Sequence, residues 1–328
     1  MKIEIAAIKE ADYESWDNFV GASTNGTLFH KSYWLKASGR PFDLWGAYKS
    51  GNLIAGYVAS RKSLLGRPVV AAPYLSAYAG LILKKPEGSP VHQISVQQEV
   101  AASFARFLPD TYSWGISLFS PGIECMLPFI WDNFVVRPWY TYVLDISDLD
   151  RVWAGIDGEW RREIRKATAA GVEVLTDVSY EKIIDVVNQS YERQGTHFRS
   201  EAVEPYFREL SRRNLCRPFL CVDKTGRVLS AAYAVWDDKR VYSILQGFTD
   251  ERTYTGASPL VKWEMMKFAS EKLGIREMDL EGTLLPRLES FHRRFGGKLT
   301  PHYEIRWGKA IETLVALNRF LAHLRGSC

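Results

Sequence analysis

The feature that most constrains the fold of this chain is a repeated apolar hairpin. Residues 44–59 and residues 220–235 each form two apolar stretches joined by a short polar turn that ends in glycine, at Gly51 and Gly226. A glycine at this position supplies the positive φ that a tight hairpin turn requires. The two glycines lie 175 residues apart, so the same hairpin occurs once in each half of the chain.

The segments around the two hairpins also follow the same order. Two helical segments precede each hairpin, and another strand, a helix and further strands follow it. This order is that of the acetyltransferase fold. We therefore expect an α+β architecture of two tandem GNAT (acetyltransferase-like) domains, each a mixed, mainly antiparallel sheet with flanking helices. The expected helices are residues 90–107, 180–194, 201–213 (after a Ser200 cap) and 259–273 (Ser258 N-cap, Pro259, Gly274 past the end), and the expected strands are 114–119, 135–145, 241–248 and 275–281.

The domain boundary is expected where the strand at 135–145 ends in a polar stretch. We predict a first domain over 1–150 and a second, active one over 151–308. A length of 328 residues is ordinary for two domains. Residues 309–328 have helical apolar spacing and are expected to pack on the domains. Attachment of this helix to a membrane surface is the alternative.

Charge and cysteine usage narrow the classes of partner. The net charge of +4 is mildly basic, which fits an anionic ligand but falls short of a DNA-binding protein. The four cysteines form no C-x-x-C pair and no histidine cluster accompanies them, so no metal site is expected. The sequence shows neither a signal peptide nor an apolar run long enough to cross a bilayer, which predicts a cytoplasmic protein.

Three stretches resemble one known family. They are residues 160–174, from Trp160 through a basic helix to Gly171, the hairpin and helix of 219–273, and residues 278–301 with a Phe-Gly-Gly at 295–297. Together they resemble the FemAB-like family, which includes Fem-type transferases that build peptidoglycan cross-bridges and related acyltransferases. The resemblance covers most of 151–307 and, more weakly, the first domain. His292 stands where the family commonly has Lys.

The basic helix is a candidate phosphate site. Trp160, Ile164 and Ala167 share a core face, which leaves the cations on other faces. The resemblance supports binding of a phosphate or nucleotide by Arg162, Arg165 and Lys166. A solvated helix face is the alternative.

The loop before the helix at 259–273 is a candidate coenzyme A site. In acetyltransferases a glycine-containing loop at this point offers backbone N–H groups to the pyrophosphate, and the helix N-terminus favours the anion. The expected contacts here are Arg252, Gly256, Ala257 and Ser258. The alternative is a surface loop with an ordinary helix cap.

Two residues are candidate proton acceptors. Glu281 ends a strand where acetyltransferase folds open toward the acceptor, and its carboxylate could take a proton from an attacking amine. His292 has an ordinary pKa suited to the same task. A structural hydrogen bond is the alternative for each.

Further substrate contacts are expected in both domains. Tyr191, Gln194 and His197 end a helix of the second domain, a region where the family often places polar contacts. In the first domain, Lys36 lies in a segment that resembles the family's entry helix and could contact a phosphate. The remaining expected contacts are Tyr242, Gln246 and Arg293.

These residues predict an N-acyltransferase or aminoacyltransferase. The acceptor would be a primary amine on a phosphate-bearing cell-envelope precursor, an amino sugar or a glycan. The donor would be acyl-CoA or aminoacyl-tRNA, with tRNA as a partner in the second case. A small-molecule or lipid-linked sugar substrate, peripheral membrane contact and an oxyanion-stabilising N–H from strand 241–248 belong to the same prediction. The alternative is a non-catalytic glycan- or nucleotide-binding protein on a degenerate GNAT fold. Binding of structured RNA is a third and weaker reading, because the charge is modest.

Overall fold

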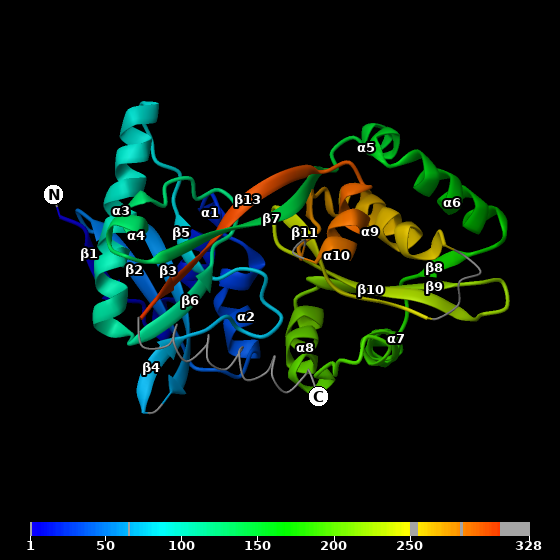
Figure 1. Cartoon of the computed structure of the whole chain (residues 1–328), viewed down its shortest axis with the longest axis horizontal. Coiled ribbons are helices and arrows are strands. Elements are labelled where there is room, and N and C mark those ends of the chain that lie inside the picture. The colour runs from blue at the N-terminus through cyan, green and yellow to red at the C-terminus, as the bar shows by residue number, and fades with distance from the viewer. Residues whose placement is uncertain (1, 65, 250–254, 283–284, 309–328) are drawn as a thin grey trace, which may run out of the picture. The chain divides into compact units, whose positions relative to one another are not determined.

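The computed structural model describes residues 2–64, 66–249, 255–282 and 285–308. They form two compact units (Figure 1). The first unit runs from the N-terminus to Trp139 and is completed by strand residues from His302 onward, and the second is Tyr140–Pro301. The predicted boundary after residue 150 falls within the second unit. The predicted helix over 309–328 lies outside the described residues.

The first unit contains the predicted hairpin around Gly51, whose φ is +78°. Its two strands pair in the antiparallel sense, with Trp45 opposite Tyr57. The strand order is β1-β2-β3-β4-β6-β13, and β5 also pairs with β3. The strands are β1 (Glu4–Ala7), β2 (Phe42–Lys49), β3 (Asn52–Leu64), β4 (Arg67–Val70), β5 (Gly80–Leu83), β6 (Trp114–Leu118) and β13 (Lys298–Trp307).

Helices cover this sheet and close the first core. The longest is α3, which begins after Ser89, whose hydroxyl accepts the backbone N–H of His92 as an N-cap. Its buried Phe104 and Leu108 belong to the core formed with Tyr57 and Trp307. The helices are η1 (Glu10–Asp12), α1 (Tyr13–Ala22), η2 (Leu28–His30), α2 (Ser32–Ala37), α3 (Pro90–Thr111) and α4 (Leu127–Trp131).

The second unit repeats this plan around Gly226, whose φ is +82°. Its strand order is β8-β9-β10-β11-β12-β7, and all neighbours are antiparallel except β11 and β12, which are parallel. Both sheets are therefore mixed and mainly antiparallel, as predicted. The strands are β7 (Val135–Asp145), β8 (Glu173–Leu175), β9 (Cys216–Val222), β10 (Val228–Trp236), β11 (Arg240–Phe248) and β12 (Glu277–Asp279).

Helices flank both faces of the second sheet: α7 and α8 lie on one face, and α5, α6 and α9 on the other (Figure 1). The apolar faces of α6 and α9 form the second core through Trp160, Ile164, Met265 and Met266. The helices are α5 (Leu149–Gly155), α6 (Gly158–Ala169), α7 (Tyr180–Glu192), η3 (Ser200–Ala202), α8 (Glu204–Arg212), α9 (Ala257–Leu273) and α10 (Pro286–Arg293).

The start of α9 differs from the prediction. Gly274 ends the helix with a φ of +66°, as expected for a left-handed C-terminal residue. The N-cap, however, is Gly256 and not Ser258, so α9 begins two residues before Pro259. The Ser258 hydroxyl lies 3.0 Å from the hydroxyl of Ser230 on β10 and does not cap the helix.

Two strands carry the chain from one unit to the other. β7 follows α4 of the first unit but pairs with β12 of the second, with Val143 opposite Asp279. β13 follows α10 of the second unit but pairs with β6 of the first, with Ile305 opposite Ser117. Each sheet is therefore completed by a strand that belongs, by its place in the sequence, to the other half of the chain.

The structure also shows the state of three cysteines and bears on metal ligands and membrane-crossing helices. Cys125 and Cys221 are buried free thiols, and Cys216 is a half-buried one. Within the described ranges, no three or more His, Cys, Asp or Glu side chains gather in a way that could hold a metal ion. No helix in the part of the chain that the structure covers has the length and apolarity to cross a membrane.

Candidate active site

The candidate site lies in the second unit where β11 and β12 separate. Their parallel pairing ends at Tyr242 and Asp279, and the next residue, Leu280, donates its N–H to Tyr142 of β7. Immediately after the separation, the register between β10 and β11 shifts so that Ile244 has no opposite residue. Such a bulge re-aims the backbone of its strand. It falls within the strand predicted to supply an oxyanion-stabilising N–H.

Glu281 lies at this separation in an unusual backbone conformation. Its φ is +53°, a left-handed value that costs energy in a residue with a Cβ and that gathers at functional sites. Its N–H donates to the Asp279 carboxylate at 3.0 Å. Among the described residues, its buried Oε1 has no hydrogen-bond partner. Burial raises the pKa of Glu281 well above its ordinary value, and the charge of Asp279 adds to this.

His292, the other candidate proton acceptor, lies beside Glu281 and forms a hydrogen bond with its backbone. It is on α10 and only 5% exposed. Burial lowers its pKa to about 3, the charge of Lys262 lowers it further, and a hydrogen bond to the backbone of Glu281 opposes both. The imidazole is therefore neutral near physiological pH.

Lys262 was not among the predicted site residues. It lies on α9 and is 1% exposed. Burial lowers its pKa to about 7, against the attraction of the Glu281 carboxylate. A signal existed in the sequence: Lys262 lies three, four and seven residues before the apolar Met265, Met266 and Ala269, and so falls on the core face of its helix.

Asp279 completes this cluster of buried titratable groups. It is fully buried and accepts hydrogen bonds from the Thr141 hydroxyl at 2.5 Å and the Glu281 N–H at 3.0 Å. Its carboxylate is thereby fixed, whereas Glu281 keeps an oxygen without a partner in the described chain. Lys262, Asp279, Glu281 and His292 are called the buried cluster below.

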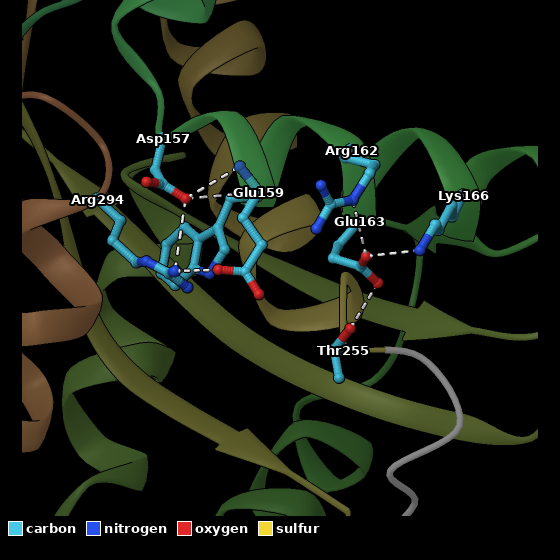
Figure 2. Close-up of polar contacts among 8 residues, drawn as sticks. Asp157, Glu159, Arg162, Glu163, Lys166, Thr255 and Arg294 are labelled. Carbon is cyan, nitrogen blue, oxygen red and sulfur yellow. Dashed lines mark hydrogen bonds and ion pairs between the residues drawn. The ribbon is translucent and has the colours of Figure 1, made fainter.

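The predicted phosphate-binding helix is α6, and its cations are largely exposed. Figure 2 shows Arg162 and Lys166 converging on Glu163, at 3.6 Å and 2.9 Å. The side chain of Arg165 lies over the Trp153 ring, 5.4 Å from its centroid. Glu163 also accepts a hydrogen bond from Thr255 at 2.8 Å. The hydrogen bond from Lys166, followed by that from Thr255, holds the pKa of Glu163 below its ordinary value.

The predicted coenzyme A loop meets this helix. Gly256 is buried at the start of α9, and a Cβ there would lie 2.3 Å from the carbonyl oxygen of Glu163. Glycine at this position therefore allows α6 to lie against the N-terminus of α9. The N-cap position makes no side-chain hydrogen bond, so the first N–H groups of α9 suit an anion, and Arg162 and Lys166 lie close by through Glu163. Buried Ala257 follows at N1, and Arg252 lies outside the described residues.

Three other residues predicted in the second unit, Tyr191, Gln194 and His197, lie at or just after the end of α7. At the end of α7, Tyr191 packs on Phe198 with ring centroids 5.1 Å apart, and His197 is exposed. Gln194 bonds the carbonyl of Ser190 and the guanidinium of Arg287 on α10. The structure thus joins this helix end to α10, the helix of His292.

The remaining predicted contacts are engaged elsewhere or stand apart. The buried Tyr242 hydroxyl donates to Asp237 at 3.2 Å, and Gln246 is half-buried farther along β11. Arg293 lies 3.7 Å from Glu289. Lys36, in the first unit, forms an ion pair with Glu10 at 2.6 Å.

Comparisons with known proteins bear on the fold. Residues 158–285 match the family described as "Acetyltransferase (GNAT) domain". The structure is similar to FemX (13% identity, 95% of this chain and 99% of that chain, TM-score 0.72). It is also similar to the C-terminal domain of a putative lysylphosphatidylglycerol synthetase from Agrobacterium fabrum (11%, 95% and 97%, TM-score 0.56). A third similar structure is a tandem GNAT protein from the clavulanic acid biosynthesis pathway (11%, 93% and 98%, TM-score 0.50).

No protein with a curated description matches the sequence. The buried cluster lies where β11 and β12 separate. Lys262, Asp279 and Glu281 all fall within the matched residues 158–285. The tandem arrangement predicted from the repeated hairpin is confirmed by the likeness to the tandem GNAT protein. The chain thus shares the fold of FemX, with two GNAT-type units in tandem, and its second half matches an acetyltransferase (GNAT) domain over residues 158–285.

Proposed function

We propose that this chain is an N-acyltransferase that moves an acyl or aminoacyl group to a primary amine. The observation that carries the proposal is the buried carboxyl group of Glu281, with one oxygen lacking a partner in the described chain, where two strands of a GNAT domain separate. A buried group of this kind is expensive to maintain in a fold. Perturbed carboxyl groups of this kind gather at catalytic sites.

In the proposed reaction the amine attacks the donor carbonyl directly. Glu281 takes the proton that the amine loses, and its raised pKa suits a base that works near neutral pH. His292, with a pKa lowered to about 3, is a weak base at that pH, which favours Glu281 as the acceptor of the proton. A backbone N–H at the Ile244 bulge stabilises the oxyanion, and the donor's leaving group departs without a covalent enzyme intermediate.

The donor is proposed to bind with its phosphates at the start of α9. The uncapped N–H groups there and the nearby Arg162 and Lys166 favour a pyrophosphate, as acyl-CoA carries. Glu163 competes with such an anion because its carboxylate holds both cations. Aminoacyl-tRNA is the second donor that the exposed cations of α6 could accept.

The acceptor is proposed to be an amine on a phosphate-bearing cell-envelope precursor, an amino sugar or a glycan. FemX and the putative lysylphosphatidylglycerol synthetase support the envelope class by likeness of fold. Arg165, exposed on α6 with its guanidinium over the Trp153 ring, is the proposed contact for the acceptor phosphate.

The role of Glu281 is tested by Glu281→Gln, which keeps the shape of the side chain and removes its basicity. Turnover should fall roughly a hundredfold or more with little change in KM, since general-base catalysis contributes about that much. The control is Glu271→Gln on the exposed part of α9, which should leave turnover unchanged. Normal turnover in Glu281→Gln would remove Glu281 from the mechanism.

The donor is tested by calorimetric titration with coenzyme A and acetyl-coenzyme A. We expect binding that Arg252→Ala weakens and that Glu163→Gln strengthens several-fold, because the latter frees Arg162 and Lys166. Absence of binding in all three proteins would exclude acyl-CoA and move the search to aminoacyl-tRNA. Absence of transfer with either donor would favour the alternative, a glycan- or nucleotide-binding protein.

A further inference from the structure

Glu281 lies just beyond the point where β12 stops pairing with β7. In the register of these two strands Val143 lies opposite Asp279, and the Leu280 N–H still donates to the Tyr142 carbonyl at 2.9 Å. The N–H of Glu281 instead donates to the Asp279 carboxylate at 3.0 Å. The backbone therefore leaves the ladder at Glu281, and a side chain replaces the neighbouring strand as the acceptor of its N–H.

The contact between Asp279 and Glu281 is an Asx-turn. A bond of this kind, from an aspartate to the N–H two residues on, folds the backbone as a turn does. Glu281 and Gly282 are both left-handed, with φ values of +53°. Glycine adopts this conformation freely, whereas for glutamate it is strained. The bond to Asp279 offsets part of that strain, and His292 adds a second hydrogen bond to the Glu281 backbone.

Thr141 on β7 fixes the carboxylate that makes this turn. Its hydroxyl donates at 2.5 Å to Oδ1 of Asp279, the same oxygen that accepts the Glu281 N–H. Thr141 is 1% exposed and Asp279 is fully buried, so water does not compete for this bond. Hydrogen bonds to a carboxylate are among the stronger ones in proteins. Without the hydroxyl, the carboxylate would be free to rotate away from Glu281.

We infer that Thr141 and Asp279 are positioning residues of the transferase: together they hold Glu281 in the left-handed conformation from which its carboxyl group takes the proton of the attacking amine. This inference rests on the proposed function. Neither residue exchanges a proton with the substrate in this role, and each acts only through Glu281. Thr141 also lies outside the matched residues 158–285, so the site depends on a strand that the family match does not include.

The first test follows the Glu281 N–H without any reaction. The protein is labelled with nitrogen-15 in its glutamates, the signal that Glu281→Gln removes is that of Glu281, and its hydrogen exchange is measured by NMR. We expect slow exchange in the wild type and in Thr141→Ser. Exchange should be roughly tenfold faster in Thr141→Val, which keeps the shape of threonine but has no hydroxyl. Rapid exchange in the wild type, or an unchanged rate in the valine variant, would overturn the inference.

A second variant keeps this test decisive if Thr141→Val fails to fold. Asp279→Asn retains an oxygen that can accept the Glu281 N–H, but a neutral acceptor makes a weaker hydrogen bond than a carboxylate. Exchange of the Glu281 N–H should therefore be roughly fivefold faster than in the wild type. Exchange at the wild-type rate would show that the carboxylate does not hold this N–H and would contradict the inference.

The second test asks whether Thr141 acts through Glu281. Thr141→Val should lower kcat roughly tenfold with little change in KM, because a displaced catalytic group loses rate and not binding. Thr141→Ser should restore most of that loss. In the Glu281→Gln background, Thr141→Val should have no further effect, since the group that it positions is already gone. The same loss of kcat in both backgrounds would show a merely structural role and would overturn the inference.

The matched control is Thr111→Val at the end of α3. It also removes a threonine hydroxyl, one that donates to the Phe107 carbonyl at 3.0 Å, and it should leave kcat unchanged. The outcomes separate the inference from the proposed function. A loss of turnover in Glu281→Gln with none in Thr141→Val would overturn the inference alone. A protein that transfers no acyl group from either donor would overturn the proposed function and the positioning role together.

Discussion

Glu281 combines a left-handed backbone conformation with a buried carboxyl group, and both are costly for a folded chain. A glutamine at this position would keep the left-handed backbone but would remove the titratable carboxyl group. This residue therefore allows a test of stability that does not depend on activity.

We expect Glu281→Gln to change how stability depends on pH. The folded pKa of Glu281 is raised, so the unfolded chain releases this proton above about pH 4.5 while the folded chain keeps it. The contribution of Glu281 is thus present below that pH and is lost as the pH rises toward the folded pKa, at about 1.4 kcal/mol per pH unit. Urea unfolding of both proteins at several pH values should show a steeper decline for the wild type.

The opposite sign is expected for Lys262. Its folded pKa is lowered to about 7, so the unfolded chain binds more protons between that pH and its ordinary pKa of 10.5. Stability contributed by the neutral amine therefore rises with pH across this window. Lys262→Met should flatten that rise in thermal unfolding above pH 7, whereas Lys272→Met should retain it. Parallel curves for wild type and Lys262→Met would contradict a buried amine with a lowered pKa.

At the residue scale the sequence predicted part of the buried cluster. Glu281 and His292 could be selected because one ends a strand and the other stands within a family motif. Lys262 could not be grouped with them from the sequence, because only the fold buries this position of α9, at 1% exposure, within the field of the Glu281 carboxylate. Tyr242 shows the converse: its place on the strand was predicted, but its hydroxyl is bonded to Asp237.

At the scale of elements, the contact of α6 with the start of α9 depends on one missing side chain. A Cβ on Gly256 would lie 2.3 Å from the Glu163 carbonyl oxygen and 3.0 Å from the Ile164 nitrogen. Both are backbone atoms of a helix, so neither can move aside alone. The glycine is what lets Thr255 reach the Glu163 carboxylate (Figure 2).

We expect Gly256→Ala to destabilise the protein by about 1–3 kcal/mol, the usual cost of overpacking. Donor binding should weaken as well, since α6 would move from the first turn of α9. The matched control is Gly155→Ala at the end of α5, where an added Cβ meets nothing within 4 Å. Urea unfolding measures the difference, and equal stability of the two variants would show that α6 can move aside freely.

The order of the elements was predicted better than their ends. Glycines with positive φ at the two hairpin turns and at Gly274 were recognisable because few other residues adopt that conformation. The N-cap of α9 was predicted wrongly at Ser258, since serine is the commoner cap. Tertiary contacts decide that position: Gly256 is required against α6, and Ser258 bonds Ser230.

At the scale of the whole molecule, the repeated hairpin could not predict that β7 pairs with β12 and that β13 pairs with β6. The pattern places similar segments in each half, and it carries no information on which sheet a final strand joins. Pairing across the sequence, such as Val143 with Asp279, appears only in the fold. The predicted boundary at residue 150 consequently falls after the strand that completes the second sheet.

A fragment cut at that predicted boundary should fold poorly. Residues 151–308 lack β7 and would expose the edge of β12, and an unpaired strand edge promotes aggregation. A fragment beginning at residue 135 keeps that strand and should stay more soluble. Size-exclusion chromatography of both fragments compares them, and a monomeric, folded 151–308 fragment would show that β7 is dispensable.

The exchanged strand also bears on how such a chain can change over generations. If the two halves arose by duplication, either copy could in principle lose its own activity and later be deleted. Thr141 lies on β7, and its hydroxyl holds Asp279 beside the proposed base. A gene that discarded its first half, with this strand, would therefore lose a support of the chemistry in the second. Selection would therefore retain the first half because it provides β7, even if that half binds no substrate.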